Sequence, residues 1–166
     1  MPTTDLKTVG DVMTRKLATL AEDDVIANID EAMHHLRVRH VPVVDRSNKL
    51  VGLLSHADLL HPAATFLADR DGASRALINE FPVGQLMQRE VLTVEAGDSL
   101  VEAGRLMWDS KVGCLPVVEP DGTLVGIITE ADFIAIALEL MGSEIKKSDI
   151  EELARTPRKA RVPLAM

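Results

Sequence analysis

A constant shift of 74 positions lays one part of the chain over another. Val9 to Leu60 aligns with Val83 to Ile134 without a gap and with about 16 identities in about 52 residues. The identities cluster in short motifs: Val9-Gly10 recurs as Val83-Gly84, Pro42-Val43-Val44 as Pro116-Val117-Val118, Leu50-Val51-Gly52 as Leu124-Val125-Gly126, and Ala57-Asp58 as Ala131-Asp132. Self-similarity at a fixed period indicates two copies of one structural unit. The chain is therefore expected to fold as a duplicated unit.

Each copy carries the same order of local patterns. A short β-type run, 17–20 or 91–94, precedes a segment with apolar residues at helical spacing: Val25, Ile29, Ala32, Met33 and Leu36 in the first copy, and Leu100, Ala103 and Met107 in the second. Two β-branched runs then flank Arg46-Ser47-Asn48 or Pro120-Asp121-Gly122, and the Asp-Gly pair is a strong hairpin signal. A second helical run follows each hairpin. The patterns predict an α/β (α+β) fold of two tandem β-α-β-β-α repeats, related by pseudo-two-fold symmetry around a central cleft.

The register also sets the expected boundaries. We predict a first repeat with its N-terminal segment at 1–60, a linker with some helix at 61–80, a second repeat at 81–142, and a C-terminal helix with a basic, poorly ordered tail at 143–166. A unit this small buries too little surface to be secure alone, so the pair is expected to fold together.

Charge and composition exclude several functions. The net charge of −8 argues against nucleic acid and anionic membranes, because both select clusters of Lys and Arg. Aromatic residues make up only 2% of the chain, too few for base-stacking platforms. No export signal or membrane span is recognisable, and a single cysteine allows no internal disulfide, so we expect a cytoplasmic protein.

The sharpest shared motif has a Gly, two aliphatic residues, a hydroxyl residue, and an Asp three positions later. It runs from Gly52 to Asp58 and from Gly126 to Asp132. One interpretation is a capping box, in which the hydroxyl and the carboxylate satisfy the first turn of a helix. The other is a nucleotide site, because a helix N-terminus offers donors to phosphate and a carboxylate accepts both ribose hydroxyls. A glycine at this point would also let a ligand approach the strand backbone.

The order of strand, helix, Pro-Val-Val strand and Gly-h-h-Ser/Thr-x-x-Asp resembles the CBS domain family, and the paired copies resemble a Bateman module. The resemblance covers nearly all of 9–134. It implies that the motif Asp binds ribose hydroxyls and that the motif Ser or Thr lies near ribose or phosphate. The residues at these positions are Asp58, Asp132, Ser55 and Thr129.

The resemblance further implies that adenine lies near the first strand and the Pro of the hairpin. The matching positions are Thr19, Leu20, Val41 and Pro42 in the first copy, and Thr93, Val94, Leu115 and Pro116 in the second. Basic residues just before the Pro hold phosphate in related nucleotide sensors, which points to Arg39 and His40. The second copy has Gly113 and Cys114 instead, so asymmetric sites are expected.

Other chemistry finds less support. His34 and His35 are adjacent on a helix and point apart, and His56 and His61 lack a compact ligand set, so we predict no metal site. We predict no catalytic residue, since Ser55 has no evident base and Cys114 lies in a β-type run typical of a buried, inert thiol. The basic residues of 155–161 are interpreted as a solvated terminus.

The sequence therefore predicts a regulatory module, not an enzyme, that binds AMP, ADP or ATP and acts through an unidentified partner or through self-association. Two alternatives stay open: a site for S-adenosylmethionine or another adenosyl ligand, and a purely structural interaction module with empty clefts. The resemblance also implies a homodimer.

Overall fold

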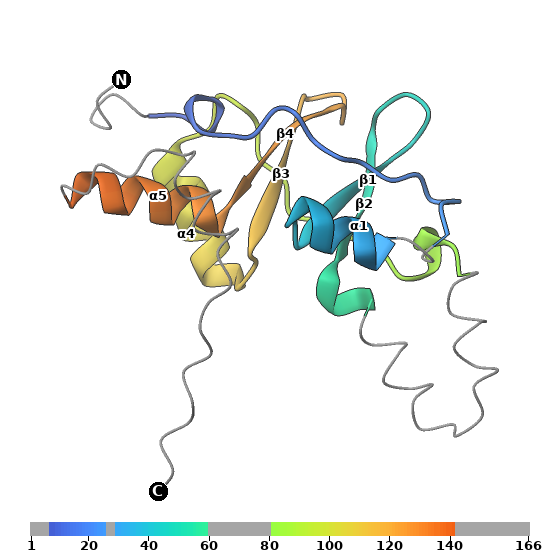
Figure 1. The fold of residues 1–166 in the computed structure, drawn as a ribbon. Helices are drawn as coiled ribbons and strands as arrows, with labels where there is room; N and C mark the ends of the chain where they lie inside the picture. Colours follow the sequence, from blue (N-terminus) through green and yellow to red (C-terminus); the bar gives the residue numbers. More distant parts are fainter. Residues whose placement is uncertain (1–6, 26–28, 60–80, 142–166) are drawn as a thin grey trace, which may run out of the picture.

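The computed structural model describes residues 7–25, 29–59 and 81–141. In each repeat a helix, two strands and a second helix follow one another, as the duplicated pattern predicts (Figure 1). They are η2 (Val9–Asp11), α1 (Ile29–Leu36), β1 (His40–Val44), β2 (Leu50–Ser55), η4 (Val83–Gln85), α4 (Leu100–Ser110), β3 (Cys114–Val118), β4 (Leu124–Thr129) and α5 (Glu130–Leu140). A further helix begins at 56 and is described as far as 59. The mixed helix and strand fold is confirmed. The predictions for 61–80 and 143–166 fall outside the described residues.

Each repeat contributes one antiparallel hairpin, β1–β2 or β3–β4. The registers are equivalent: His40 pairs with Ser55, Cys114 pairs with Thr129, and each ladder shifts by one residue near its turn. The turns need positive φ, which Asn48 (61°) and Gly122 (87°) supply. The hairpins follow the sequence prediction closely.

The first strand of each repeat is much shorter than expected. Leu20 makes a single parallel bridge with Val43, through hydrogen bonds from Leu20 N to Pro42 O (3.0 Å) and from Val44 N to Leu20 O (2.8 Å). Val94 makes the equivalent bridge with Val117. A β-type run can extend a ladder only where the neighbouring strand continues beside it, and here the contact is limited to one residue.

The helices after these bridges are amphipathic. In α4, Leu100, Ala103 and Met107 are buried, as their spacing predicts, and Ser99 caps the first turn by accepting from Glu102 N. In the first repeat, the buried positions on α1 are Ile29 and Met33. Val25, Ala32 and Leu36 were expected on the same face, but all three are exposed. Val25 (51%) precedes the helix and Leu36 (55%) ends it.

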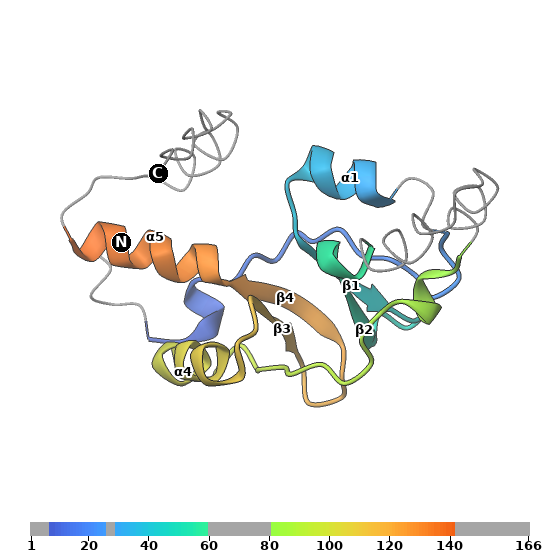
Figure 2. The same cartoon turned by 90° about the horizontal axis from the view of Figure 1, so that it is seen from below.

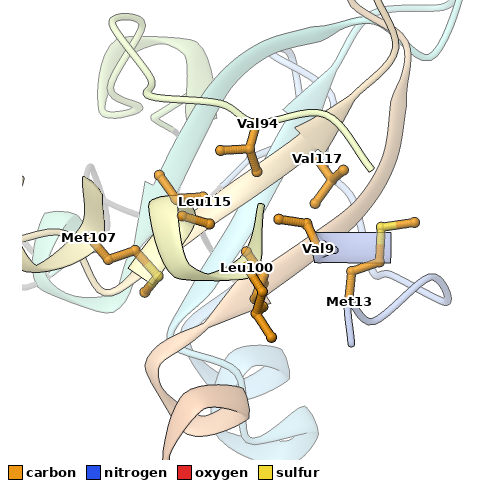
Figure 3. Close-up of a cluster of buried hydrophobic side chains, with 9 residues drawn as sticks. Val9, Met13, Val94, Leu100, Met107, Leu115 and Val117 are labelled. Carbon is orange, nitrogen blue, oxygen red and sulfur yellow. The ribbon is translucent and has the colours of Figure 1, made fainter. Parts of the chain in front are cut away.

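The two cores exchange segments. The segment at 9–13 packs Val9 and Met13 against the second repeat, in a cluster whose other members are Val94, Leu100, Ala103, Met107, Leu115, Val117 and Ile128 (Figure 3). Reciprocally, Val83 and Met87 pack with Ile29, Met33, Val41, Val43, Leu54 and Leu59 of the first repeat. Figures 1 and 2 both place the blue N-terminal segment beside the elements of the second repeat and the lime segment after residue 80 beside β1 and β2. Each repeat therefore completes the core of the other.

Backbone hydrogen bonds hold these exchanged segments in place. Thr14 pairs with Ile127, and its counterpart Gln88 pairs with Leu53, each pair exchanging two bonds of 2.9–3.0 Å. The hairpin turns also meet, through bonds of 3.0 Å from Leu50 N to Gly122 O and from Leu124 N to Asn48 O. Because every bond recurs with partners shifted by 74 positions, these contacts follow a pseudo-two-fold relation between the repeats.

The glycines that precede the shared motif have a structural explanation. A Cβ built on Gly52 would lie 2.5 Å from Met87 Sδ, and one on Gly126 would lie 2.6 Å from Met13 Sδ. The space that we expected a ligand to use is filled by a methionine of the exchanged segment. These two glycines are required for packing between the repeats.

Candidate ligand-binding site

The two motif carboxylates act as helix caps in the structure. Asp58 Oδ2 accepts from Ser55 N (2.7 Å) and from Ser55 Oγ (2.5 Å), while Asp58 N donates to Ser55 Oγ (3.2 Å). Asp132 Oδ2 accepts from Thr129 N and Oγ1, both at 2.9 Å, in a capping box at the start of α5. Capping fixes the direction of each carboxylate. The capping interpretation of the motif is thus confirmed. The binding of a ligand by these carboxylates stays a prediction.

Asp58 also faces the other repeat. Its second oxygen, Oδ1, lies 3.4 Å from Gln88 Nε2, and Gln88 belongs to the segment exchanged into this core. Ser55 pairs with His40 across the β1–β2 hairpin. The hydroxyl, the carboxylate and the imidazole of the first repeat are therefore held at one end of a single hairpin.

Arg39 and His40 reach from that end toward the second repeat. The His40 ring lies against Gly113, since a Cβ built on Gly113 would be 3.1 Å from His40 Cε1 and 3.6 Å from Glu130 Oε2. Arg39 Nη2 lies 3.9 Å from Glu130 Oε2, in a salt bridge whose side chains are 77% and 56% exposed. Sequence reasoning placed Arg39 and His40 but missed Glu130 and the packing role of Gly113.

A signal for Glu130 was present in the repeat itself. The shift of 74 positions aligns Glu130 with His56, and Gly113 with Arg39. Before the hairpin, Arg39 of the first repeat corresponds to Gly113, which has no side chain. At the helix start, the His56 imidazole of the first repeat corresponds to the Glu130 carboxylate. This complementary substitution brings an acid of one repeat to a base of the other.

Burial and charge set the protonation of the groups around this contact. Burial lowers the pKa of His40 below its ordinary value, and the neighbouring Arg39 lowers it further, against the opposing effect of Glu130 and Asp58. Burial, with a smaller contribution from Glu130, raises the pKa of the Cys114 thiol to about 12. Cys114 is 3% exposed, so it is a buried thiol with little nucleophilic character.

The residues expected near adenine fall into two groups. Thr19 and Thr93 are exposed and Leu20 is half-buried, whereas Val94 is 8% exposed. Val41, Leu115, Pro42 and Pro116 are buried in the two cores. While those cores stay packed, any ligand contact of Val41 or Leu115 has to use backbone atoms.

The structure bears on two further classes of site. Within 7–25, 29–59 and 81–141, no group of three or more His, Cys, Asp or Glu side chains is arranged to hold a metal ion. In the same ranges, no helix has the length and hydropathy that a bilayer crossing requires.

The fold and the site define a pair of pseudo-symmetric α/β repeats. A carboxylate caps a helix at the equivalent position of each repeat, and a charged contact joins the two repeats. The family model for the CBS domain matches this chain twice, at residues 9–64 and 83–139. The chain belongs to the CBS domain family and contains two CBS repeats.

Several relatives share this organisation. The CBS domain-containing protein CBSX1, chloroplastic, of Arabidopsis thaliana is 33% identical over 86% of this chain and 69% of its own length. The crystal structure of AcuB from Vibrio cholerae has a TM-score of 0.70 at 36% identity, covering 81% of this chain and 93% of that one. The crystal structure of CBSX2 in complex with AMP has a TM-score of 0.68 at 31% identity, covering 81% and 98%.

The same module also occurs within longer proteins. Homoserine O-acetyltransferase of Methanococcus vannielii is 27% identical over 74% of this chain, but the match spans only 23% of the enzyme. In that relative the repeats form one part of a larger protein.

Proposed function

We propose that this chain is a regulatory module that binds an adenine nucleotide (AMP, ADP or ATP) where its two repeats meet, and that it transmits occupancy to a partner protein or through self-association. The observation that carries the proposal is the convergence of Ser55, Asp58, Arg39 and His40 at one end of the β1–β2 hairpin. The complex of CBSX2 with AMP supports the ligand class.

Each residue at this end has a role in the proposal. Asp58 accepts the ribose hydroxyls through Oδ1, replacing its long contact with Gln88, while Oδ2 remains the helix cap. Ser55 and the helix N-terminus lie near ribose or phosphate, Arg39 neutralises the phosphate, and His40 donates a hydrogen bond to it. Thr129 and Asp132 form the equivalent but less basic site, because Gly113 and Cys114 replace the cations. The adenine lies near Thr19, Leu20, Thr93, Val94 and the backbone of Val41, Pro42, Leu115 and Pro116.

Ligand binding acts by biasing the arrangement of the repeats. The site is built from side chains of both repeats, so a ligand that draws Arg39 from Glu130 changes a contact between them. A ligand shifts such an equilibrium only by the difference in its affinity for the two arrangements. We propose no catalytic step, and we place the protein in the cytoplasm.

Thermal unfolding of the purified chain against adenosine, AMP, ADP, ATP, GTP and S-adenosylmethionine tests the proposal. Ligand at about 100 times its dissociation constant adds about 2.7 kcal/mol, a rise in Tm of about 5–10 °C for a chain of this size. We expect selectivity for adenine ligands and loss of the shift in Asp58→Ala or Asp132→Ala, whichever lies in the occupied site.

A matched control separates capping from binding. Asp11 caps η2 in the same manner, since its Oδ2 accepts from Thr8 N (2.8 Å) and Thr8 Oγ1 (2.9 Å). Asp11→Ala and Asp58→Ala should each lower stability by removing a helix cap, but Asp11→Ala should keep the ligand response. No shift with any ligand in folded wild-type protein would instead favour a structural interaction module with empty clefts.

Self-association is the second part of the proposal. Helices α4 and α5 leave large apolar side chains at the surface, with Trp108 75%, Val101 64% and Ile134 59% exposed. Beside them is a groove of about 360 Å³, lined by Leu100, Val101, Gly104, Arg105, Trp108, Phe133 and Ile136. A two-fold dimer pairs such a face with the same face of a second copy, and in doing so removes it from water.

A further inference from the structure

We propose that Glu130 is a specificity-determining residue that limits the number of phosphates the site accepts. The inference rests on the proposed function, because it concerns the ligand of that same site. Glu130 stands at the first position of α5, in the second repeat, but its carboxylate faces Arg39 of the first repeat.

Geometry places Glu130 in the path of a phosphate chain. Its Oε2 lies 3.9 Å from Arg39 Nη2. A Cβ added to Gly113 would lie 3.6 Å from this Oε2 and 3.1 Å from His40 Cε1, so the carboxylate and the imidazole lie close to the same point. A phosphate that binds Arg39 and His40 must therefore share the guanidinium with Glu130 or displace its carboxylate. The salt bridge itself is exposed and weak, so displacement is possible.

The charge of the ligand determines how strongly Glu130 opposes its binding. Asp58 and Glu130 are the acidic groups that act on His40 at this junction, and Arg39 provides the cation, because burial and Arg39 hold the pKa of His40 below its ordinary value. Adenosine brings no charge, while each added phosphate brings negative charge toward Glu130. At a separation of about 6 Å in a water-like dielectric, each unit of charge changes the affinity about threefold, and more where water is excluded.

The repeat provides an internal comparison. The residue that corresponds to Glu130 in the first repeat is His56, so the first repeat has no carboxylate at this position. Glu130 is thus a feature of one copy only, and a histidine is compatible with a helix start at this position.

Isothermal titration of the full-length chain with adenosine, AMP, ADP and ATP at low and high ionic strength tests the inference. In Glu130→Gln we expect affinity to rise about tenfold for AMP, whose phosphate carries about two negative charges, and by more for ADP and ATP, with adenosine changed by less than about twofold. The ATP gain should shrink at high salt. If the substitution only removed a helix cap or altered the fold, the change in affinity would not increase with the charge of the ligand.

Two further variants keep the outcome clear. Glu102→Gln removes the same charge from the first turn of α4, and it should leave the order of affinities unchanged. If Glu130→Gln does not fold, Glu130→His takes its place, with an equal or larger gain for ATP expected. An equal change for all four ligands, or the same change in Glu102→Gln, overturns the inference.

Failure of the proposed function has a different signature. If wild-type protein binds none of the four ligands, the proposed function and this inference both fall. If wild type binds them and Asp58→Ala or Asp132→Ala loses them, the proposed function stands, and the Glu130 variants alone decide whether the inference does.

Discussion

The contact between Gly52 and Met87 offers a sharp test of the exchanged cores. An alanine methyl at position 52 would lie 2.5 Å from Met87 Sδ and 3.0 Å from the carbonyl oxygen of Gln88. Overpacking of this kind costs about 1–3 kcal/mol. Replacing glycine within a strand returns about 0.5–1 kcal/mol. Gly52→Ala should therefore lower the free energy of unfolding by up to about 2.5 kcal/mol and the Tm by up to about 10 °C.

A double-mutant cycle shows whether Met87 is the cause. Met87 is 7% exposed, and Met87→Ala should cost about 2–5 kcal/mol by leaving a cavity. In the double variant the steric conflict with Sδ is gone, so its loss should be smaller than the sum of the two single losses by about 0.5–3 kcal/mol.

The assay is urea and thermal unfolding of the four proteins, with Gly97→Ala as the control. A Cβ on Gly97 meets nothing within 4 Å, so this variant should unfold like wild type. Additivity of the two changes to within about 0.5 kcal/mol would refute the exchange, because residues that do not touch contribute independently.

Three further predictions follow from the site and the surface. Because burial and Arg39 lower the pKa of His40, the unfolded chain binds its proton more readily; stability should fall as pH drops below about 6.5, and His40→Gln should flatten that dependence in pH-resolved urea titrations. With a pKa of about 12, Cys114 is roughly one ten-thousandth thiolate at pH 8, so a thiol reagent should label it only after denaturation, and rapid labelling of native protein would contradict its burial. Sedimentation should show Trp108→Glu shifting a wild-type dimer toward monomer, while Leu92→Glu, at a side chain 43% exposed outside the groove, should not; equal behaviour of both variants would exclude the α4–α5 face.

The sequence was sufficient for the local structure of each repeat. Hairpins, turns and caps depend on residues close together, such as Asp121-Gly122 at a turn or Thr129 and Asp132 at a helix start, and the structure has them where the pattern predicts. The first strands were overestimated, because β-branched composition indicates extended backbone but does not say how far a neighbouring strand runs beside it.

The exchange of segments was beyond sequence reasoning for a definite reason. The apolar spacing of Val9 and Met13 predicts burial, yet the two repeats offer nearly identical cores. Local patterns are the same whether the segment packs on its own repeat or on the other. The choice is made by chain geometry, which a duplicated sequence does not encode in any one motif.

The candidate site was predictable in its parts and not in its assembly. Asp58, Ser55 and His40 were named from the motif, and the hairpin brings them together. The contact of Arg39 with Glu130 depends on how the two repeats meet, and nothing local to either residue determines that arrangement.

The exchanged segments also set an order for folding during synthesis. Thr14 hydrogen-bonds Ile127, a residue that a ribosome adds 113 positions later, which takes about 6–23 s at 5–20 residues per second. Throughout that interval Val9 and Met13 lack the complete core in which they pack, whereas the first hairpin is complete once residue 55 has been added. The first segment made can therefore pack only after β4, the last strand, has been synthesised. A nascent chain that stalls earlier leaves Val9 and Met13, and the apolar residues of the incomplete second repeat, exposed to chaperones.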